Sequence, residues 1–319
     1  MLDLKISVII PFYNAREYVT QAVESALMQP ETGEVLLIED DSPDGGIEIC
    51  QNLAKKYSTV RLLRHPDGKN HGASASRNLG IKNAVFPYVA FLDADDYYLA
   101  DRFHTTAEIF DKYPNADGVY EAVTTIFQNE MAKEMFGSLK NKEIITINKK
   151  IKPEQLFEEL MNGHTGSIHL NGLSLHKSIF DKIGLFSVEL RLHQDTELFY
   201  RLCAKGNLFP GEIENPVAIQ RIHQQNRITY QLADRRRLYT TRILMWRSLI
   251  EWGKSNFTQR QRKLVLFRFL AHLKIIDHFP DFSLKDYWIS RRKMLGLAFE
   301  FPELLVNKYF WKLVLPLKN

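Results

Sequence analysis

Three carboxylates close an apolar run in the first third of the chain. The stretch Val89–Asp96 reads VAFLDADD, so Asp93, Asp95 and Asp96 follow a segment that is predicted to be a buried strand. Like charges a few ångströms apart repel and raise each other's pKa, so such a cluster needs either full solvation or a cation. Hard divalent ions such as Mg²⁺ and Mn²⁺ suit carboxylates that leave room for substrate phosphates. The pattern therefore indicates a metal site, and an exposed acidic turn remains the alternative.

A second acidic cluster follows another apolar run. Residues 34–38 are predicted to form a strand, and its end is followed by Glu39, Asp40, Asp41 and Asp44. The first strand, over residues 5–11, ends in the turn PFYN instead of a glycine-rich phosphate loop. This turn argues against a dinucleotide-binding site.

Strands and helices alternate in the N-terminal part of the chain. Because short loops separate them, they predict right-handed crossovers and a doubly wound, mostly parallel α/β sheet. The carboxyl ends of parallel strands meet at one edge, so Pro11, Asp40 and the cluster at Asp93–Asp96 are expected to converge in one crevice. The strands are expected at residues 5–11, 34–38, 60–64 and from 89, and the helices after residue 15, over 47–57 and 73–85, and from 101.

The chain after residue 115 is less regular. Asp195 lies in the first turn of a helix expected over residues 193–205, where an acid favours the helix dipole, so capping is a sufficient explanation of that residue taken alone. The other expected features are a strand over 116–128, a charged segment over 129–152, a helix over 153–161, and strands over 170–176 and 217–222, the last leading into His223.

Composition indicates a soluble globular protein. The 319 residues are 45% hydrophobic and 25% charged. The two cysteines, Cys50 and Cys203, have no metal-ligand spacing and favour a reducing compartment. The N-terminus resembles no signal peptide, and no apolar run is long enough to span a bilayer. A cytoplasmic location is therefore expected.

The two ends of the chain differ in charge. Residues 231–319 hold 18 Lys and Arg against 7 Asp and Glu, whereas the remainder holds 24 against 31. This basic, aromatic and helical end has three interpretations: a surface for anionic membrane lipid, a homodimer interface, or helices packed on the rest of the chain with their charges solvated. Nucleic acid is not an expected partner, because no recognition motif accompanies the bases.

Taken together, several motifs in this order resemble the family-2 glycosyltransferases with the GT-A fold. The resemblance covers roughly residues 5–228 and rests on the combination of motifs. They are SVIIPFYN at Ser7–Asn14, IEDDSPDG at Ile38–Gly45, ASASRNLGI at Ala73–Ile81, FLDADD at Phe91–Asp96, KIGLF at Lys182–Phe186, HQDTELFYRL at His193–Leu202, and Arg221 with His223.

The resemblance implies a fold and a division of the chain. The expected fold is a GT-A, Rossmann-like sheet flanked by helices, followed by a C-terminal helical region. Residues 1–115 would form the nucleotide-sugar-binding half of the GT-A domain and residues 116–228 its acceptor-binding, catalytic half. Residues 229–319 would be the basic amphipathic helices.

The resemblance also implies roles for individual residues. A nucleotide pocket would be formed by Pro11, Tyr13, Asp40, Arg77 and Asp93. A divalent ion, Mn²⁺ or Mg²⁺, would be bound by Asp95 with Asp93 and His223. Asp195 would be the catalytic base, and His193 and Gln194 would contact the acceptor.

The implied reaction is a single inverting displacement. The acceptor hydroxyl would attack C1 of a nucleotide sugar, a UDP-sugar being favoured by Asp40, while a carboxylate removes its proton. The metal would stabilise the departing diphosphate. The acceptor would be a saccharide or a lipid-linked saccharide in bacterial polysaccharide or lipopolysaccharide assembly, with the enzyme cytoplasmic or peripheral on the inner face of the membrane.

Departures from the family pattern leave alternatives open. Gln194 stands where the family commonly has Glu, and Glu39 and Asp41 replace the usual Asp and Gly beside Asp40. A catalytically silent nucleotide-sugar-binding scaffold is one alternative, and a metal-dependent nucleotidyltransferase is a weaker one. Zinc is disfavoured, because no chelating pair at helical spacing occurs among His164, His169, His176 and His193.

Overall fold

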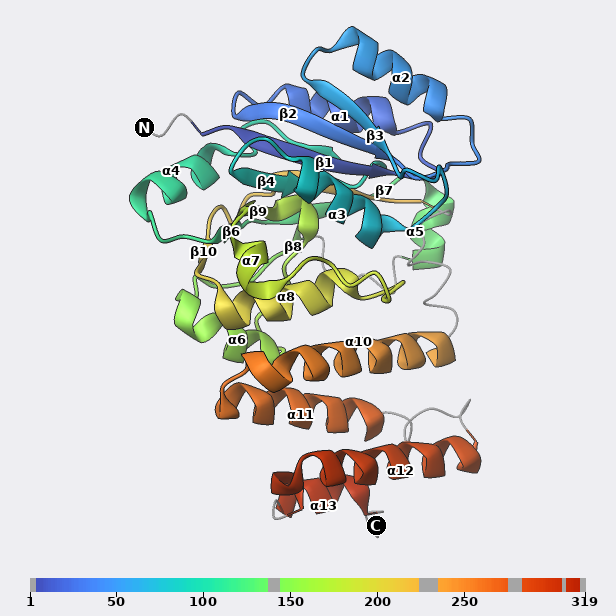
Figure 1. Ribbon diagram of the computed structural model, residues 1–319, viewed down its shortest axis with the longest axis vertical. Helices are drawn as coiled ribbons and strands as arrows, with labels where there is room; N and C mark the ends of the chain where they lie inside the picture. Colours follow the sequence, from blue (N-terminus) through green and yellow to red (C-terminus); the bar gives the residue numbers. More distant parts are fainter. Residues whose placement is uncertain (1–3, 137–143, 224–234, 275–282, 306–307, 316–319) are drawn as a thin grey trace. The chain divides into compact units, whose positions relative to one another are not determined.

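The computed structural model describes residues 4–136, 144–223, 235–274, 283–305 and 308–315 (Figure 1). The chain divides into two compact units, Met1–Tyr230 and Gln231–Asn319.

A large sheet forms the centre of the first unit. Its strand order over the described residues is β10-β6-β9-β4-β1-β2-β3. All of these strands run parallel except β9, which is antiparallel to both β4 and β6. The bounds are β1 Ile6–Phe12, β2 Thr32–Glu39, β3 Val60–Arg64, β4 Tyr88–Phe91, β6 Gly118–Tyr120, β9 Leu173–His176 and β10 Leu208–Pro210. The predicted mostly parallel α/β sheet is thereby confirmed.

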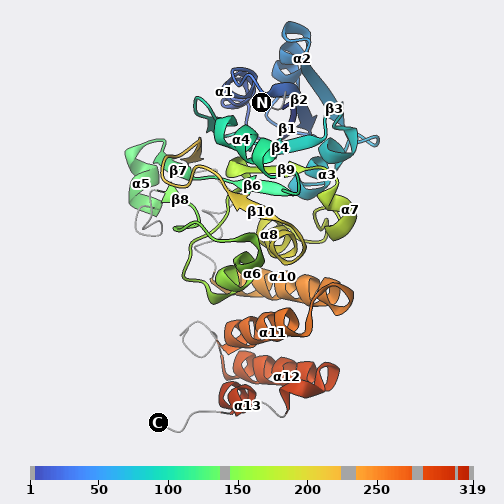
Figure 2. The same cartoon turned by 90° about the vertical axis from the view of Figure 1, so that its left-hand side faces the viewer.

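Helices cover both faces of this sheet, as Figures 1 and 2 show. The crossovers through α1 (Val19–Leu27) and α2 (Ile47–Lys56) lie on one face, and α3 (Ala73–Asn83) lies on the other. Strand β1 is apolar on both sides because both faces are covered. On the α3 side the approach is close: a Cβ on Gly80 would lie 2.5 Å from a methyl carbon of Ile9. The remaining helices of this unit are α4 His104–Lys112, α5 Glu130–Phe136, α6 Pro153–Asn162, α7 Ile179–Ile183 and α8 Gln194–Lys205.

A smaller sheet, with the order β5-β11-β7-β8 over the described residues, corrects one prediction. Residues 116–128 are not one strand, because β6 belongs to the large sheet whereas β7 belongs to the small one. The predicted strand over 170–176 begins instead with the 3-10 turn Leu170–Gly172, and part of the segment over 129–152 is helix α5. The small sheet consists of β5 Tyr97–Tyr98, β7 Val123–Phe127, β8 Ile144–Ile145 and β11 Ala218–Ile222.

A buried ion pair explains the break between β6 and β7. The carboxylate of Glu121 accepts hydrogen bonds from the guanidinium of Arg102 and from Thr106 Oγ1, and burial raises the pKa of Glu121. The Glu121 amide bonds to the Gly172 carbonyl, and a Cβ on Gly172 would lie 2.3 Å from the Glu121 carbonyl oxygen. The strand breaks here because Glu121 turns inward to neutralise a fully buried arginine.

The described part of the second unit is helical, which confirms the predicted C-terminal helical region. Helix α12 begins at a capping box in which Ser283 and Asp286 exchange hydrogen bonds. No described helix has the length and apolar character needed to cross a bilayer. The helices are α10 Arg235–Asn256, α11 Gln259–Lys274, α12 Leu284–Glu300 and α13 Lys308–Val314.

Candidate active site

The carboxyl ends of β1, β2 and β4 lie side by side in the sheet. Strand β1 pairs with β2 up to Phe12 opposite Glu39, and with β4 up to Ile9 opposite Phe91. The Asp40 amide continues the ladder by donating to the Phe12 carbonyl at 3.1 Å. Pro11 near the end of β1, and Asp40 and Asp93 on the loops after β2 and β4, therefore lie at one edge of the sheet, because parallel strands all end on the same side.

The second carboxylate of the FLDADD motif meets a histidine from the far end of the unit. Nε2 of His223 lies 3.0 Å from Oδ2 of Asp95, and the Tyr18 ring packs 5.0 Å from the His223 ring. The small sheet produces this contact. Strand β5 follows Asp96, pairs with β11, and β11 ends one residue before His223.

Asp96 and Arg221 hold the contact between Asp95 and His223 in place. The Arg221 amide donates to Oδ1 of Asp96 at 2.7 Å, and Asn171 Nδ2 donates to Oδ2 at 2.7 Å. The Arg221 guanidinium donates to the Asp95 carbonyl, also at 2.7 Å. Burial raises the pKa of Asp96 well above its ordinary value, and the charges of Asp95 and Asp93 add to this effect. Asp96 is therefore a structural member of the cluster, which leaves Asp93 and Asp95 facing the crevice.

Asp95 and His223 fit a divalent ion. Adjacent ligands of an octahedral Mg²⁺ at about 2.1 Å are separated by about 3.0 Å. The two side-chain atoms already lie 3.0 Å apart as a hydrogen-bonded pair, and a bound ion would replace that bond. In the described part of the chain no three His, Cys, Asp or Glu side chains converge closely enough to hold a metal by themselves. Two protein ligands with the remaining positions left to water and phosphate oxygens suit Mg²⁺ or Mn²⁺, so the site could bind the ion together with a phosphorylated substrate.

Asp93 pairs with a cation from α3. Nη2 of Arg77 lies 2.6 Å from Oδ1 of Asp93, and the guanidinium packs over the Phe186 ring. Arg77 is only 5% exposed, and its Nε and Nη1 make no hydrogen bond to the described residues. The arginine offsets part of the negative charge of the cluster and keeps N–H donors available to a ligand.

The Asp40 carboxylate is buried and bonds to the loop that precedes α3. Its carboxylate accepts hydrogen bonds from the amides of His71 and Gly72, both at 2.8 Å, and from Asn70 Nδ2 at 3.1 Å. Sequence reasoning did not identify Asn70, although it follows the glycine of the turn HPDGKN. Asp40 thus organises the loop before α3, and a direct contact between Asp40 and a nucleotide base stays a prediction.

The loop after β1 lies at the same edge of the sheet. Tyr13 is 43% exposed and Pro11 is half-buried. Three bonds between described residues hold this loop against the one after β2: the Asn14 amide donates to Ser42 Oγ at 2.7 Å, and the amide and Nη1 of Arg16 donate to Oδ2 and the carbonyl of Asp44 at 2.8 and 3.2 Å. An exposed aromatic ring on an anchored loop could stack on a flat ligand.

The predicted base lies at the start of α8. Oδ1 of Asp195 accepts bonds from the amide and the hydroxyl of Thr196, at 2.7 and 3.3 Å, so the side chain does help to cap the helix. Within the described residues, Oδ2 of Asp195 makes no hydrogen bond. The preceding His193 has a left-handed backbone, with a φ of 59°, which turns the chain sharply into the helix. Capping therefore uses one carboxylate oxygen and leaves the other for chemistry.

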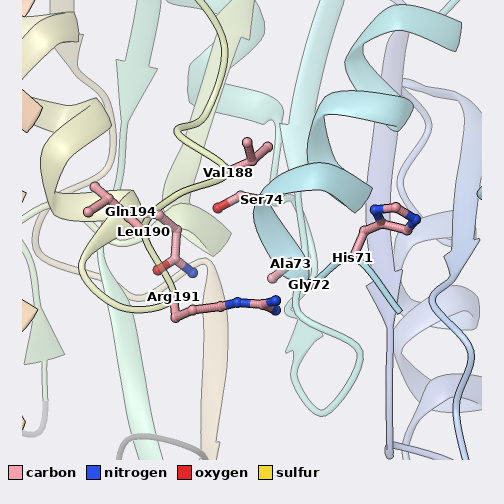
Figure 3. Close-up of a pocket in the computed structure, with 8 residues that line it drawn as sticks. All are labelled: His71, Gly72, Ala73, Ser74, Val188, Leu190, Arg191 and Gln194. Atoms are coloured by element: carbon pink, nitrogen blue, oxygen red, sulfur yellow. The ribbon is translucent and has the colours of Figure 1, made fainter. Parts of the chain in front are cut away.

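A shallow pocket separates the start of α3 from the loop before α8 (Figure 3). Sequence reasoning placed Gln194 in an acceptor site but did not identify the other residues of this pocket. Of these, only Ala73 and Ser74 lie in the family motif ASASRNLGI, and the others carry no local signal. The lining residues are His71, Gly72, Ala73, Ser74, Val188, Leu190, Arg191 and Gln194.

With this geometry in view, comparison with known proteins identifies the family. The sequence pattern of Glycosyl transferase family 2 matches residues 7–177, more than half of the chain. The chain therefore belongs to glycosyl transferase family 2, as its motifs predicted.

Several curated relatives match part of the chain. The uncharacterized glycosyltransferase YibD of Escherichia coli K12 is 43% identical over 102 residues, which cover 32% of this chain and 29% of YibD. The minor teichoic acid biosynthesis protein GgaB of Bacillus subtilis 168 is 38% identical over 112 residues, which cover 34% of this chain and 12% of GgaB. An uncharacterized glycosyltransferase of Haemophilus influenzae is 24% identical over 220 residues, 68% of either protein. The chain thus spans only a minor part of YibD and GgaB.

Solved structures share the fold over nearly the whole chain. Residues 1–349 of TarS from S. aureus superpose with a TM-score of 0.63 at 15% identity, covering 92% of this chain and 79% of that one. The complex of the same TarS segment with UDP gives 0.61 at 16% identity, with coverages of 98% and 83%. This likeness confirms the predicted GT-A fold with a helical C-terminal region.

Proposed function

We propose that this protein transfers a sugar from a nucleoside diphosphate sugar to a hydroxyl group of a saccharide or lipid-linked acceptor, with inversion at C1. The observation that carries the proposal is the 3.0 Å approach of His223 to Asp95 at the strand edge where Pro11, Asp40 and Asp93 also lie. Family membership supports it. A UDP-sugar is the favoured donor, because the TarS segment has structures in complex with UDP and with UDP-GlcNAc.

The donor would be held by residues of both acidic loops. Tyr13 and Pro11 would contact the base, the loop shaped by Asp40 would bind the nucleoside, and Arg77 would donate from its unpartnered Nε and Nη1 atoms to the nucleotide. Asp95 and His223, with Asp93 beside them, would hold Mn²⁺ or Mg²⁺. When bound, such an ion supplies positive charge that stabilises the diphosphate leaving group.

Asp195 would act as the general base. Its Oδ1 is fixed by Thr196, so Oδ2 can face an acceptor hydroxyl held by Gln194 and His193. As the oxygen of this hydroxyl bonds to C1, its proton passes to Asp195 and the bond between C1 and the phosphate oxygen breaks. One nucleoside diphosphate leaves for each glycosidic bond formed.

The Asp195→Asn variant tests this assignment. We expect the rate of UDP release from UDP-GlcNAc, with water or saccharide acceptors, to fall about 100- to 10,000-fold, because a general base contributes that much. Calorimetric UDP binding should remain within twofold of the wild type. The matched control is Asp181→Asn, which removes an exposed carboxylate of α7.

Two results would contradict the proposal. If Asp195→Asn turns over as fast as the wild type, Asp195 is not the base. If the wild type binds UDP yet releases none from any nucleotide sugar, a silent nucleotide-sugar-binding scaffold is the better description.

The biological setting we propose is assembly of a bacterial cell-surface polymer, such as a polysaccharide or lipopolysaccharide, at the cytoplasmic face of the membrane. GgaB, named for minor teichoic acid biosynthesis, supports this setting. Helix α12 supports the membrane location, because Leu284, Trp288 and Phe299 are 82%, 69% and 84% exposed. With the exposed Leu295 they recur at helical spacing, and the cations Lys285 and Arg292 lie beside them. An apolar stripe flanked by bases matches an anionic lipid surface.

A further inference from the structure

The pocket between α3 and the loop before α8 contains unused hydrogen-bond donors. Ser74 is 5% exposed, and its buried Oγ makes no hydrogen bond in the described part of the chain. Figure 3 shows this oxygen directed from α3 toward the side of the pocket that carries Leu190 and Gln194. A buried hydroxyl without a partner is unfavourable, so a ligand that accepts its proton would be stabilised there.

The backbone of α3 adds further donors. The N-cap residue, Gly72, has no side chain to cap the helix, and its own amide is used by Asp40. The first-turn amides of Ala73, Ser74 and Ala75 therefore lack a side-chain cap. This eleven-residue helix directs the positive end of its dipole into the pocket.

A guanidinium closes the opposite side. Arg191 lies so near Gly72 that a Cβ there would be 2.9 Å from its Nη1. Gly72 also has a φ of +85°, a backbone conformation that favours glycine. Within the described residues Arg191 has no hydrogen-bond or ion-pair partner, and the side-chain amide of Gln194 makes no hydrogen bond. Figure 3 shows the Arg191 side chain extending toward Gly72.

We infer that this pocket binds an oxyanion, a phosphate or a carboxylate, carried by the acceptor. A helix N-terminus, a hydroxyl and a guanidinium are the groups that bind such anions in proteins. The pocket is separate from the pair Asp95 and His223, where the donor diphosphate is proposed to bind. Gln194 lines it and precedes Asp195, so the anion would sit beside the hydroxyl that reacts. The assignment of the anion to the acceptor rests on the proposed function, whereas the binding of the anion itself does not.

The test follows amide hydrogen exchange at residues 72–76 by mass spectrometry while inorganic phosphate is added at constant ionic strength. We expect phosphate to slow exchange there in the wild type and at least about tenfold more phosphate to be needed in Arg191→Gln and Ser74→Ala. The matched control is Lys82→Gln, which removes a positive charge from the other end of α3. UDP affinity should stay within twofold in all three variants.

The arms of the experiment separate the possible sources of the anion. If saturating UDP with Mn²⁺ leaves the phosphate protection in place, the pocket is free for the acceptor, as inferred. If UDP with Mn²⁺ abolishes it, the site belongs to the donor diphosphate and the acceptor assignment is overturned. Absence of protection in the wild type, or equal protection in Arg191→Gln, overturns the anion site itself. None of these outcomes depends on observing glycosyl transfer.

Discussion

At the scale of single residues, the site depends on one contact across the small sheet. Asp95 and His223 are 128 positions apart, yet their side-chain atoms are 3.0 Å apart. Arg221, two residues before His223, bonds to Asp96 and to the Asp95 carbonyl. These bonds hold the two chain segments of the contact together. If these two side chains bind the ion as proposed, their fixed placement means that little rearrangement is needed.

This contact predicts how nucleotides bind. In calorimetric titrations of UDP, GDP, dTDP and CMP, we expect UDP to bind most tightly and to need Mn²⁺. Asp95→Ala should remove the metal-dependent part, and His223→Gln should weaken it at least about tenfold, because each loses an ion ligand. The matched control is His176→Gln, whose Nδ1 instead bonds to Ser178. Equal Mn²⁺ dependence in wild type and Asp95→Ala would rule out this metal site.

At the scale of elements, the crevice is shaped by loops that hold one another. Asp44, in the loop after β2, accepts bonds from Ser42 Oγ at 2.7 Å and from the amides of Arg16 and Gly46 at 2.8 and 2.9 Å. Burial by itself would raise the pKa of Asp44, but the accepted bonds outweigh it and lower the pKa below 3.8. Asp44 thereby ties the Tyr13 loop to the second acidic loop.

This tie predicts a pH-dependent stability difference. Because the pKa of Asp44 is lower in the folded state, its carboxylate stabilises the fold above its unfolded pKa, and this contribution is lost as pH falls through the folded pKa. We expect Asp44→Asn to lower the free energy of unfolding by on the order of 1 kcal/mol at neutral pH. The difference in unfolding free energy between wild type and variant should become smaller below about pH 4.

Urea unfolding followed by circular dichroism measures this difference. All four tryptophans, at positions 246, 252, 288 and 311, lie in the second unit, so tryptophan fluorescence serves as an internal control that should not move. Asp181→Asn provides the matched loss of an exposed carboxylate. A deficit that is the same at neutral pH and at pH 3 would show that the Asp44 charge contributes nothing.

At the scale of the whole molecule, charge is divided between the two units. Residues 231–319 carry an excess of bases, and the rest of the chain carries an excess of acids. In the second unit, the exposed stripe Leu284, Trp288, Leu295 and Phe299 provides the apolar part of an amphipathic surface. Such a surface binds anionic bilayers through apolar burial together with charge attraction.

Vesicle sedimentation of the full chain tests this surface. We expect binding to phosphatidylcholine vesicles that contain phosphatidylglycerol, weak binding to phosphatidylcholine alone, and loss of binding with added salt. The double variant Trp288→Ser, Phe299→Ser should bind at least about tenfold more weakly, because two large apolar side chains are removed. Met28→Ser, which removes a 73% exposed apolar side chain from the first unit, is the matched control.

The homodimer interpretation makes the opposite prediction for the same variants. If sedimentation velocity shows a dimer that Trp288→Ser, Phe299→Ser dissociates while vesicle binding is unchanged, the stripe is a subunit interface. The membrane proposal would then be wrong.

Much of the fold could be predicted from local pattern. The strand over residues 60–64 and the start of the helix at Ala73 agree with the structure, because apolar periodicity and turn residues are local properties. The error at residues 116–128 has a tertiary cause, since Glu121 leaves the strand pattern to pair with Arg102, which lies 19 positions earlier. The sequence pattern of that stretch gives no sign that Glu121 has a partner elsewhere in the chain.

The candidate site divides in the same way. The sequence by itself determined the family, the parallel sheet and the convergence of Pro11, Asp40 and Asp93 at one edge, because strand order and handed crossovers follow from the order of elements. Only the tertiary structure decided that Asp96 is a buried support, that His223 meets Asp95, and that Arg191 faces Ser74 across Gly72. These contacts join segments far apart in the chain, and their distances depend on how the elements pack, which local sequence patterns do not encode.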